Sequence, residues 1–435
     1  MEQSGQSARR ARYLHVAQGA AAGAAGGAAA VAFRLALEGA EALRGLAGAY
    51  IAAHPWALAL WLGLLAGAAG LAAALLRWQP FIGGSGIPQV EGELQGSLEQ
   101  NWWQVLAAKF AGGVVCVGAG LSLGREGPSI QLGAMAGKGV GRLLGARAPS
   151  PALLLTCGAS AGLSAAFNAP FAGVLFALEE LHHTFSADVL LCAMSASVTA
   201  DMVARLVCGG APEFGLTAAG ALPLSAYPLV ALLGLALGGL GAFYNFCLGK
   251  SQDLYARISR PWLRLLIPFL LAGVLLAACP SILGGGRGLV LQAAAGPALG
   301  AALGLLAAKF LFSMASFGCG APGGIFLPLL VLGALTGAAC SAGLGALGLD
   351  APAANYAMLG MAGLFAAIVR APATGVILIC EMNGSFTHLL SLTLVSLAAY
   401  AAADLLGARP VYDQLLDRLL AGRQRAEAAR KKQDL

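Results

Sequence analysis

The sequence predicts an all-α integral membrane protein built from two repeats, and three features of the chain lead to this fold class. Of its 435 residues, 58% are hydrophobic and only 11% are charged, whereas soluble domains average about 25% charged residues. Long apolar stretches recur along the chain, and its two halves carry matching motifs. A duplicated apolar chain with glycine-proline breaks at matching points is typical of a membrane transporter.

The apolar stretches predict membrane helices, some of them broken. Two stretches reach the roughly 20 residues that cross a bilayer as a helix, and the others are shorter. Short apolar segments predict interrupted or re-entrant helices, which are tolerated at membrane depth only inside protein. Glycine is frequent, with 62 residues, and small residues let helices approach closely in a membrane. The stretches are 19–33, 56–76, 229–248, 265–278, 299–311 and 389–403.

An internal repeat relates the two halves of the chain. The pentapeptide LAAKF occurs at 106–110 and again at 306–310. With this offset of 200, 13 of the 32 positions from 106 to 137 are identical in the second copy. Further on, 161–180 resembles 362–382, where the second copy has one extra residue before its proline. The duplication predicts a substrate site where interrupted helices of the two repeats meet.

The extent of the repeat predicts the domain organisation. Residues 1–435 are expected to form a single membrane domain, with one repeat at about 30–210 and the other at about 225–406. The segment 209–223 joins them. Whether the repeats are parallel or inverted does not follow from sequence identity alone, because it depends on the number of spans in each repeat.

The two ends of the chain carry much of the net charge of +6. The positive-inside rule therefore predicts that the terminal segments 1–15 and 413–435 lie in the cytoplasm. The second segment is predicted to be a short charged helix. Binding to nucleic acid is disfavoured, because Glu427 interrupts the basic run and no aromatic residues interleave it. The terminal basic residues are Arg9, Arg10, Arg12, Arg418, Arg423, Arg425, Arg430, Lys431 and Lys432.

The nine cysteines predict neither a disulfide framework nor a metal site. They are scattered through apolar stretches without a CxxC pair, so we interpret them as small buried hydrophobic residues. His182 and His183 are interpreted as interface residues rather than metal ligands, because no further ligands cluster near them in the sequence. No cofactor is expected. The chain also lacks a nucleophile-base pair, a phosphate loop or metal-ligand spacing, so we do not expect an enzyme.

Three segments share one design, in which glycines precede a proline and an apolar helical run. They are GGSGIPQVEG at 83–92, GREGPSIQLG at 124–133 and GGIFLPLLVLG at 323–333. Proline is favoured at the first helical position. Each segment therefore predicts a helix N-terminus inside an apolar protein. Its free N–H groups and positive dipole end attract an anion without a full charge, which suits a transported anion that has to be released.

Glu126 is the most informative single residue in these segments. It lies just before the Gly127-Pro128 helix start, and an ionisable group within a membrane indicates a functional site. Its carboxylate is an anion and can occupy the amide groups that would bind a substrate anion, and protonation would release them. The alternative is a surface-loop glutamate that pairs with Arg125.

Several other polar residues lie at the ends of apolar runs. Glu180 is a candidate proton acceptor, because its repeat counterpart is Met382, whereas Glu179 has a counterpart in Glu381. An acidic helix end at the membrane surface is the alternative for both glutamates. Ser85 and Tyr412 supply hydroxyl donors. Lys109 and the repeat-related Lys309 either place charge along a pathway or extend to the membrane surface.

At these residues the chain resembles the chloride channel and transporter (CLC) family. The motifs that carry the resemblance are GSGIP at 84–88, GREGP at 124–128, GGIFLP at 323–328 and Tyr412 in RPVYDQLL, and it covers nearly the whole chain. The resemblance implies a CLC-like fold of inverted repeats and a homodimer in the membrane lipid. Each subunit would have its own anion pathway.

The resemblance also implies roles for particular residues. Chloride would be held by the Ser85 and Tyr412 hydroxyls and by the N–H groups of Ile325 and Phe326. Glu126 would be the outer gate and Glu180 the internal proton-transfer residue. Backbone groups would form the remaining anion sites, and Lys109 would lie near the pathway. These backbone residues are Gly84 for the inner site and Gly124, Arg125 and Gly127 for the outer site.

The resemblance favours a proton-coupled exchanger over a passive channel. Family members that exchange chloride for protons are similar to this chain in having a glutamate at the position of Glu180, after FNAPFAG. The lack of paired cytoplasmic regulatory domains resembles compact prokaryotic members, which implies a bacterial inner membrane. The alternatives are a voltage- or pH-gated passive chloride channel of the same fold and, more remotely, a membrane scaffold that transports nothing.

Overall fold

The computed structural model describes residues 2–145, 150–216 and 220–433. Within this part of the chain the protein is helical, and its only extended pairing is an isolated antiparallel bridge between Gly124 and Gly324. The helices of the first half are α1 (Glu2–Ala53), α2 (Ala57–Trp78), α3 (Ile87–Leu94), α4 (Trp102–Gly118), α5 (Glu126–Leu144), α6 (Pro151–Phe167), α7 (Pro170–Phe176) and α8 (Ala187–Cys208).

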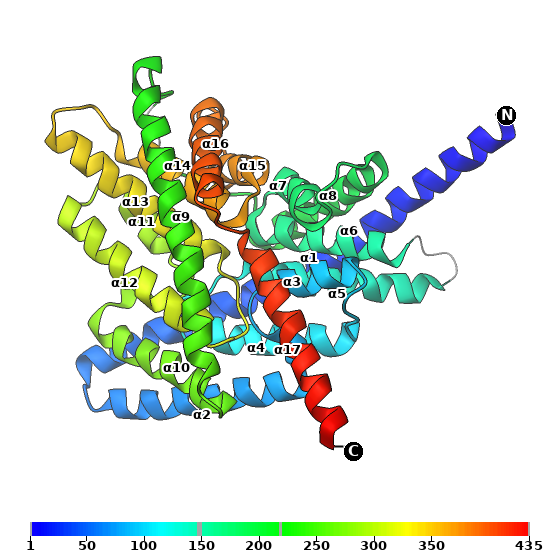
Figure 1. Cartoon of the computed structure of the whole chain (residues 1–435), viewed down its shortest axis with the longest axis horizontal. Coiled ribbons are helices and arrows are strands. Elements are labelled where there is room, and N and C mark those ends of the chain that lie inside the picture. The colour runs from blue at the N-terminus through cyan, green and yellow to red at the C-terminus, as the bar shows by residue number, and fades with distance from the viewer. Residues whose placement is uncertain (1, 146–149, 217–219, 434–435) are drawn as a thin grey trace.

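The second half repeats this order and adds a C-terminal helix (Figure 1). The LAAKF pentapeptides lie in α4 and α12, and the glycine-proline segments begin α5 and α13. The helices are α9 (Tyr227–Ala256), α10 (Pro261–Ala278), α11 (Arg287–Ala294), α12 (Leu299–Gly318), α13 (Phe326–Ala346), α14 (Ala353–Val369), α15 (Pro372–Asn383), α16 (Leu389–Leu405) and α17 (Val411–Gln433).

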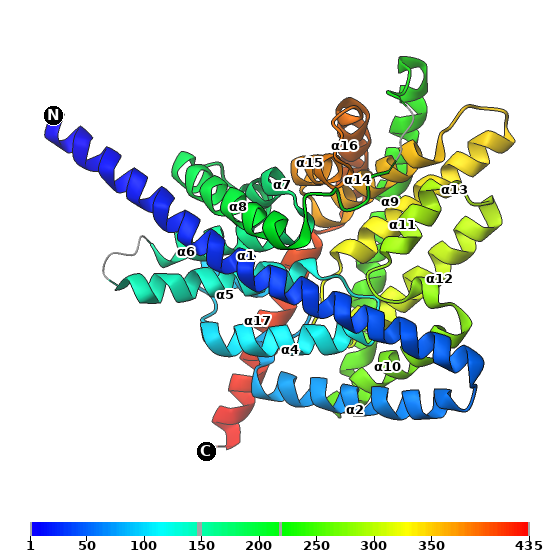
Figure 2. The same ribbon diagram turned by 180° about the vertical axis from the view of Figure 1, so that it is seen from behind.

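Equivalent helices make equivalent contacts in the two halves. Helix α5 packs most extensively on α6, and α13 packs most extensively on α14. Likewise α1 packs along α8, and α9 packs along α16. Helix α1 crosses one face of the molecule (Figure 2), and α9 crosses the opposite face (Figure 1). The predicted two-repeat, all-α architecture is confirmed.

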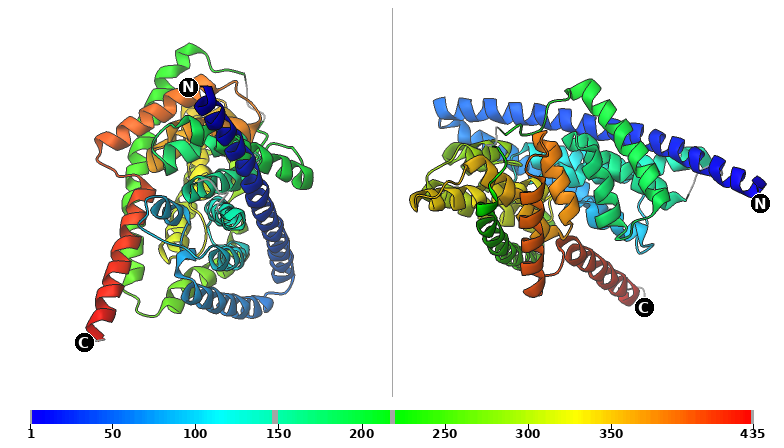
Figure 3. Two further views of the ribbon diagram at one scale, coloured as in Figure 1. Left: turned by 90° about the vertical axis from the view of Figure 1, so that its right-hand side faces the viewer. Right: turned by 90° about the horizontal axis from the view of Figure 1, so that it is seen from above.

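The repeats are inverted with respect to each other. The related helices α5 and α13 meet at their N-termini across the antiparallel bridge between Gly124 and Gly324. Repeat-related helices that begin at one point and run in opposite directions are typical of inverted repeats. In transporters built this way, the substrate site lies at the interface between the repeats. The first turns of α1 and the last turns of α17 project from the helical body (Figure 3).

Most of the short apolar stretches are parts of longer helices, and here the sequence prediction was wrong. The stretch 19–33 lies within α1, which is 52 residues long. In all, seven helices of the described chain are long and apolar enough to cross a membrane. Apolar stretches end where charged residues such as Arg34 appear, but arginine and glutamate are good helix formers, so the helix continues. The short helices α3, α7 and α11 do fit the predicted interrupted type.

The predicted termini are described only in part. The segment 413–435 is helical through Gln433, as expected, because α17 covers it. All nine cysteines, which lie in the described chain, are free, and five of them are buried. The side chains of Arg9, Arg10, Arg12, Arg430, Lys431 and Lys432 lie outside the described residues, so the predicted orientation of the termini stays a prediction.

Glycine allows the closest helix contacts, as its frequency suggests. In the first repeat, a Cβ added at Gly133 would meet the carbonyl oxygen of Gly158, and one added at Gly158 would meet that of Gly133. In the second repeat, Gly333 and Gly360 make the same reciprocal contact. The pairs α5–α6 and α13–α14 are therefore in backbone contact, which dispersion forces and small residues favour in a membrane.

This contact gives a first testable expectation. A methyl group at Gly337 in α13 would collide with the backbone carbonyl of Tyr356, whereas one at Gly343 in the same helix meets no atom within 4 Å. Gly337→Ala should therefore destabilise the protein by about 1–3 kcal/mol, the usual cost of overpacking. Gly343→Ala is the matched control, since it makes the same change in the same helix. Equal thermal unfolding of the two variants in detergent would contradict the close packing of α13 on α14.

Candidate functional site

The site lies where the N-termini of α5 and α13 face each other. Gly124 N donates to Gly324 O at 2.7 Å, and Gly324 N donates to Gly124 O at 2.8 Å. The first helical turns follow at once, because α5 begins at Glu126 and α13 at Phe326. Two positive helix ends therefore converge on one buried point, as the glycine-proline motifs predicted.

Two further glycine contacts stabilise this point symmetrically. Gly84 N donates to Gly320 O at 3.3 Å, and the repeat-related Gly284 N donates to Gly120 O at 2.8 Å. Helix α3 follows Gly86, whose φ of 96° is a left-handed conformation that glycine adopts without strain. The backbone at Gly84 therefore contacts the loop before α13, and the inner anion site that the resemblance implied there stays a prediction.

The Glu126 side chain occupies the space between the two helix ends. It is fully buried, and its Oε2 accepts a hydrogen bond from Leu327 N, in the first turn of α13, at 3.3 Å. A Cβ at Gly124 would collide with this carboxylate. The other carboxylate oxygen, Oε1, has no hydrogen-bond partner in the described chain. An anionic group thus fills the site that the sequence predicted for a transported anion.

The alternative of a surface-loop Glu126 paired with Arg125 is wrong. Glu126 is not on the surface, and the closest ion pair of Arg125 joins its Nη2 to Glu213 Oε2 at 2.7 Å. The buried position follows from the chain turn at Gly124, which brings Glu126 to the first turn of α5 and directs it at the opposing helix end.

The two predicted hydroxyl donors, Ser85 and Tyr412, are buried near the first turn of α5. A Cβ at Gly127 would collide with Ser85 Oγ, so the serine lies directly against the start of α5. Ser85 is 2% exposed and Tyr412 is fully buried. Their hydroxyls face each other without a hydrogen bond of good geometry, and neither has another partner in the described chain. Buried hydroxyls without partners are costly, and an anion between them would use both donors.

Helix α13 supplies the predicted backbone donors. Its first helical hydrogen bond runs from Leu329 N to Ile325 O at 3.0 Å, so the N–H groups of Ile325 and Phe326 precede the helical ladder. Both residues are buried. The structure therefore brings together Glu126, Ser85 and the start of α13 around one point.

Lys109 supports the site's backbone. Its buried ammonium group donates to Ile82 O at 2.9 Å and to Gly84 O at 2.7 Å. Lys309 makes the matching bonds to Ile282 and Gly284 in the second repeat. Neither lysine reaches the surface, so the alternative of extension to the membrane surface is wrong. A role for Lys109 as a pathway charge stays a prediction.

Glu179 and Glu381 link the repeats to each other. Glu179 accepts hydrogen bonds from Ala373 N at 3.1 Å, Thr374 N at 2.7 Å and Thr374 Oγ1 at 2.8 Å, at the start of α15. In return, Glu381 accepts bonds from the first turn of α7. The repeat relation between these two glutamates therefore has a structural origin, because each carboxylate caps the other repeat's helix.

Glu180 lies apart from this pair, in a π-helical turn at Ala177–Leu181. It is 4% exposed, so the alternative of an exposed acidic helix end is wrong for this residue. Tyr412 interacts electrostatically with both Glu126 and Glu180. π-Helical turns are frequent at functional sites, since they change the direction of single side chains.

Sequence reasoning missed a cluster beside Glu180. Glu91, His183 and Asp413 place one potential ligand atom each within 4.8 Å of one another, and His183 Nε2 lies 3.8 Å from Glu91 Oε1. Glu91 and Asp413 also interact electrostatically with Glu180. These residues are far apart in the chain. Their proximity could have been indicated only by the position of Glu91 in the glycine-proline segment 83–92 and of Asp413 beside Tyr412.

Two cavities are lined by residues of the site. One, of about 410 Å³, is lined by Gly84, Ser85 and residues of α9 and α12. The other, of about 310 Å³, is lined by Arg125, Leu327 and several charged side chains. A larger cavity of about 800 Å³ beside Glu93 contains none of the predicted site residues. Each of the two smaller cavities is thus lined by residues next to the helix starts, Ser85 in one and Arg125 with Leu327 in the other.

These features define a class of protein: a multi-pass membrane protein in which inverted repeats meet at paired helix N-termini, the architecture of transporters with a site between repeats. Residues 68–404 match the family model described as voltage gated chloride channel. The chain belongs to this family, the CLC family whose motifs it carries.

Similar proteins of known name cover most of the chain. It is 38% identical over 372 residues to the "H(+)/Cl(-) exchange transporter ClcA" of Klebsiella pneumoniae subsp. pneumoniae, which covers 82% of this chain and 78% of that protein. The Yersinia pestis protein of the same name is 37% identical over 365 residues, with 81% and 76% covered. Among solved structures, a slow cyanobacterial Cl−/H+ antiporter superimposes with a TM-score of 0.89 at 30% identity, over 94% of this chain and 98% of that one.

Proposed function

We propose that this protein is a secondary active transporter that exchanges chloride for protons. The observation that carries the proposal is the position of Glu126, whose carboxylate accepts from Leu327 N between the N-termini of α5 and α13. One point can thus hold either a fixed carboxylate or a free anion. The names of the H+/Cl− exchange transporters and the antiporter structure that this chain resembles support chloride and protons as the substrates.

Protonation of Glu126 couples the two ions. A protonated side chain carries no negative charge, so it loses its attraction to the two helix ends, and chloride takes its place. In the central site chloride would accept from the Ser85 and Tyr412 hydroxyls and from the N–H groups of Ile325 and Phe326. Helix dipoles and neutral donors bind an anion weakly enough to release it.

The outer and inner anion sites would be formed by backbone. The segment from Gly124 through Arg125 to Gly127 would supply the outer site, which Glu126 fills as the gate. Gly84 would border the inner site, where Lys109 holds the carbonyl oxygens of Ile82 and Gly84 away from the anion.

Glu180 would transfer the proton between Glu126 and the cytoplasm. It is buried, and it interacts electrostatically with Tyr412 and with Asp413, two residues at the start of α17. A proton and a chloride ion would then share the region around Glu126 and Tyr412 but leave it by different routes. Since the ions carry opposite charge and move in opposite directions, each cycle moves net charge across the membrane.

The cellular setting follows from the same family. We infer a homodimer in the lipid of a bacterial inner membrane, with both termini in the cytoplasm. Exposed leucine and phenylalanine side chains on α8, α9 and α16 suit contact with lipid or with a second copy. Cross-linking in membranes followed by mass measurement would test the dimer independently of transport.

The decisive experiment uses purified protein in liposomes with a chloride gradient, with the voltage clamped by valinomycin and potassium. Chloride and proton movement are recorded together. Uphill proton movement driven by the chloride gradient alone supports the exchanger. Chloride flux without proton movement supports the second candidate, a passive voltage- or pH-gated chloride channel of this fold. Absence of any anion flux would contradict both and leave a non-transporting scaffold.

A further inference from the structure

The segment that joins the two repeats reaches over the arginine-lined cavity. Its first part, 209–216, is held at two points: Asn168 Nδ2 donates to Gly209 O at 3.1 Å, and Phe214 N donates to Met382 O at 3.0 Å. Between these contacts lies Glu213, whose side chain is 4% exposed. Glu213 is therefore a linker residue whose side chain is buried beside this cavity. A segment that served only to connect the two repeats would not need a buried glutamate.

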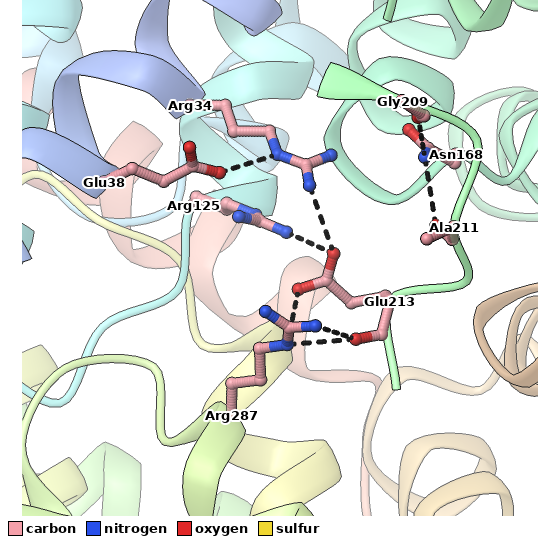
Figure 4. Close-up of polar contacts among 8 residues, drawn as sticks. All are labelled: Arg34, Glu38, Arg125, Asn168, Gly209, Ala211, Glu213 and Arg287. Atoms are coloured by element: carbon pink, nitrogen blue, oxygen red, sulfur yellow. Dashed lines mark hydrogen bonds and ion pairs between the residues drawn. The ribbon is translucent and has the colours of Figure 1, made fainter. Parts of the chain in front are cut away.

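Three arginines from three elements surround the Glu213 carboxylate (Figure 4). Arg125 Nη2 lies 2.7 Å from Oε2, Arg34 Nη2 lies 3.8 Å from Oε2, and Arg287 Nε lies 3.5 Å from Oε1. Arg287 also donates to the Glu213 carbonyl oxygen from Nε at 2.9 Å and from Nη2 at 2.6 Å. Glu38 accepts from Arg34 Nε at 3.0 Å and is the second carboxylate in the group.

The arginines have more donors than these carboxylates use. The buried atoms Arg34 Nη1 and Arg125 Nε have no hydrogen-bond partner in the described chain. Guanidinium groups with free donors bind anions well, because their charge is delocalised and their N–H groups are arranged as a planar fork. The cluster is therefore suited to hold an anion in addition to, or in place of, the Glu213 carboxylate.

The cavity places this cluster on the route to Glu126. Its lining includes Arg34, Arg125, Arg287 and Glu213, and it reaches Leu327, whose N–H binds the Glu126 carboxylate. An anion that approaches Glu126 from this end has to pass the arginines. The Glu213 carboxylate lies where such an anion would be bound first.

We propose that Arg34, Arg125 and Arg287 form a further anion-binding site at the outer entrance, and that Glu213 is a tethered anion that competes with chloride for it. The identity of the anion rests on the proposed function. Because the linker keeps the carboxylate near the arginines, its effective concentration is in the millimolar range or above. Chloride at comparable concentration displaces it, and segment 209–216 then opens the entrance.

The test compares Glu213→Gln with Glu38→Gln. Both variants remove one negative charge from the same cavity, but Glu38 is half exposed and pairs only with Arg34. Flux is measured in right-side-out membrane vesicles as external chloride is varied, with gluconate keeping the ionic strength constant. Glu213→Gln should lower the half-saturating external chloride about three- to tenfold, which is roughly 0.6–1.4 kcal/mol of lost competition. Glu38→Gln should change it by less than about twofold.

Inverted vesicles provide the control for sidedness, because there the same variant should leave the half-saturating chloride unchanged. If Glu213→Gln does not fold, Glu213→Asp keeps the charge on a shorter side chain and should give an intermediate decrease. An unchanged or raised half-saturating chloride in either Glu213 variant overturns the proposal. Equal shifts in Glu213→Gln and Glu38→Gln overturn it too, because they would indicate general electrostatics rather than competition at one site.

Hydrogen exchange separates this proposal from the proposed function. In the unmodified protein, chloride at constant ionic strength should speed amide exchange in 209–216, including the Phe214 N–H bonded to Met382. In Glu213→Gln, exchange should be fast without chloride. Chloride-dependent opening without any transport would leave the entrance site standing and overturn the exchanger. Transport by a protein whose segment 209–216 does not respond to chloride would overturn the entrance site and leave the exchanger standing.

Discussion

Glu126→Gln should abolish proton transport while chloride still crosses the membrane. The substitution keeps the size of the side chain and removes its charge, so the bond from Leu327 N no longer holds an anion between the helix ends. Without a titratable group at this point, the proton has no carrier. We expect coupled proton flux to fall about a hundredfold or more, the scale of a lost proton-transfer group, with chloride flux of the same order as before.

The pH dependence of transport provides a second measurement of the same gate. In the unmodified protein, lower external pH protonates Glu126 and frees the helix ends, so chloride flux should rise as pH falls. Glu126→Gln mimics the protonated state, and its chloride flux should no longer depend on pH. Glu38→Gln is a suitable control, because it removes a half-exposed carboxylate that lines the same cavity and pairs with Arg34. Proton flux that persists in Glu126→Gln would exclude Glu126 as the gate.

The meeting point of the helix starts could be predicted from sequence because its signals are local and occur twice. GREGP and GGIFLP each specify a helix start through glycine and proline, and the repeat offset relates Gly124 to Gly324, which are bonded to each other in the structure. Motif and repeat together therefore predicted that helix starts meet between the repeats and that Glu126 lies within the membrane protein, but not the inverted topology or the bridge itself.

Other features could not be predicted from the sequence, because they depend on contacts between residues that no local sequence motif connects. Glu213 lies in a linker without a motif, and its partner Arg287 is 74 residues away. The length of α1 was hidden by Arg34, which ends the apolar run but not the helix. Lys109 was recognised as repeat-related, yet its carbonyl partner Gly84 could be found only from the folded backbone.

Glu180→Gln should also remove proton coupling, and its neighbour provides a matched control. Glu180 and Glu179 are adjacent, so the same substitution can be made at either. Glu179 accepts three hydrogen bonds from Ala373 and Thr374 and joins the repeats, whereas Glu180 is buried and interacts electrostatically with Tyr412. Glu180→Gln should therefore decrease proton flux to background without loss of thermal stability.

Glu179→Gln should show the opposite behaviour. The amide retains one oxygen acceptor but loses the charge-assisted bonds to the start of α15, which should lower stability by about 1–3 kcal/mol, while the protein that remains folded still couples protons to chloride. Simultaneous chloride and proton recordings, with thermal unfolding in detergent, separate the two roles. Coupling that survives in Glu180→Gln would exclude it as the internal proton-transfer residue. Since the case for exchange over passive conduction depends on a second proton site beyond Glu126, that result would favour a channel.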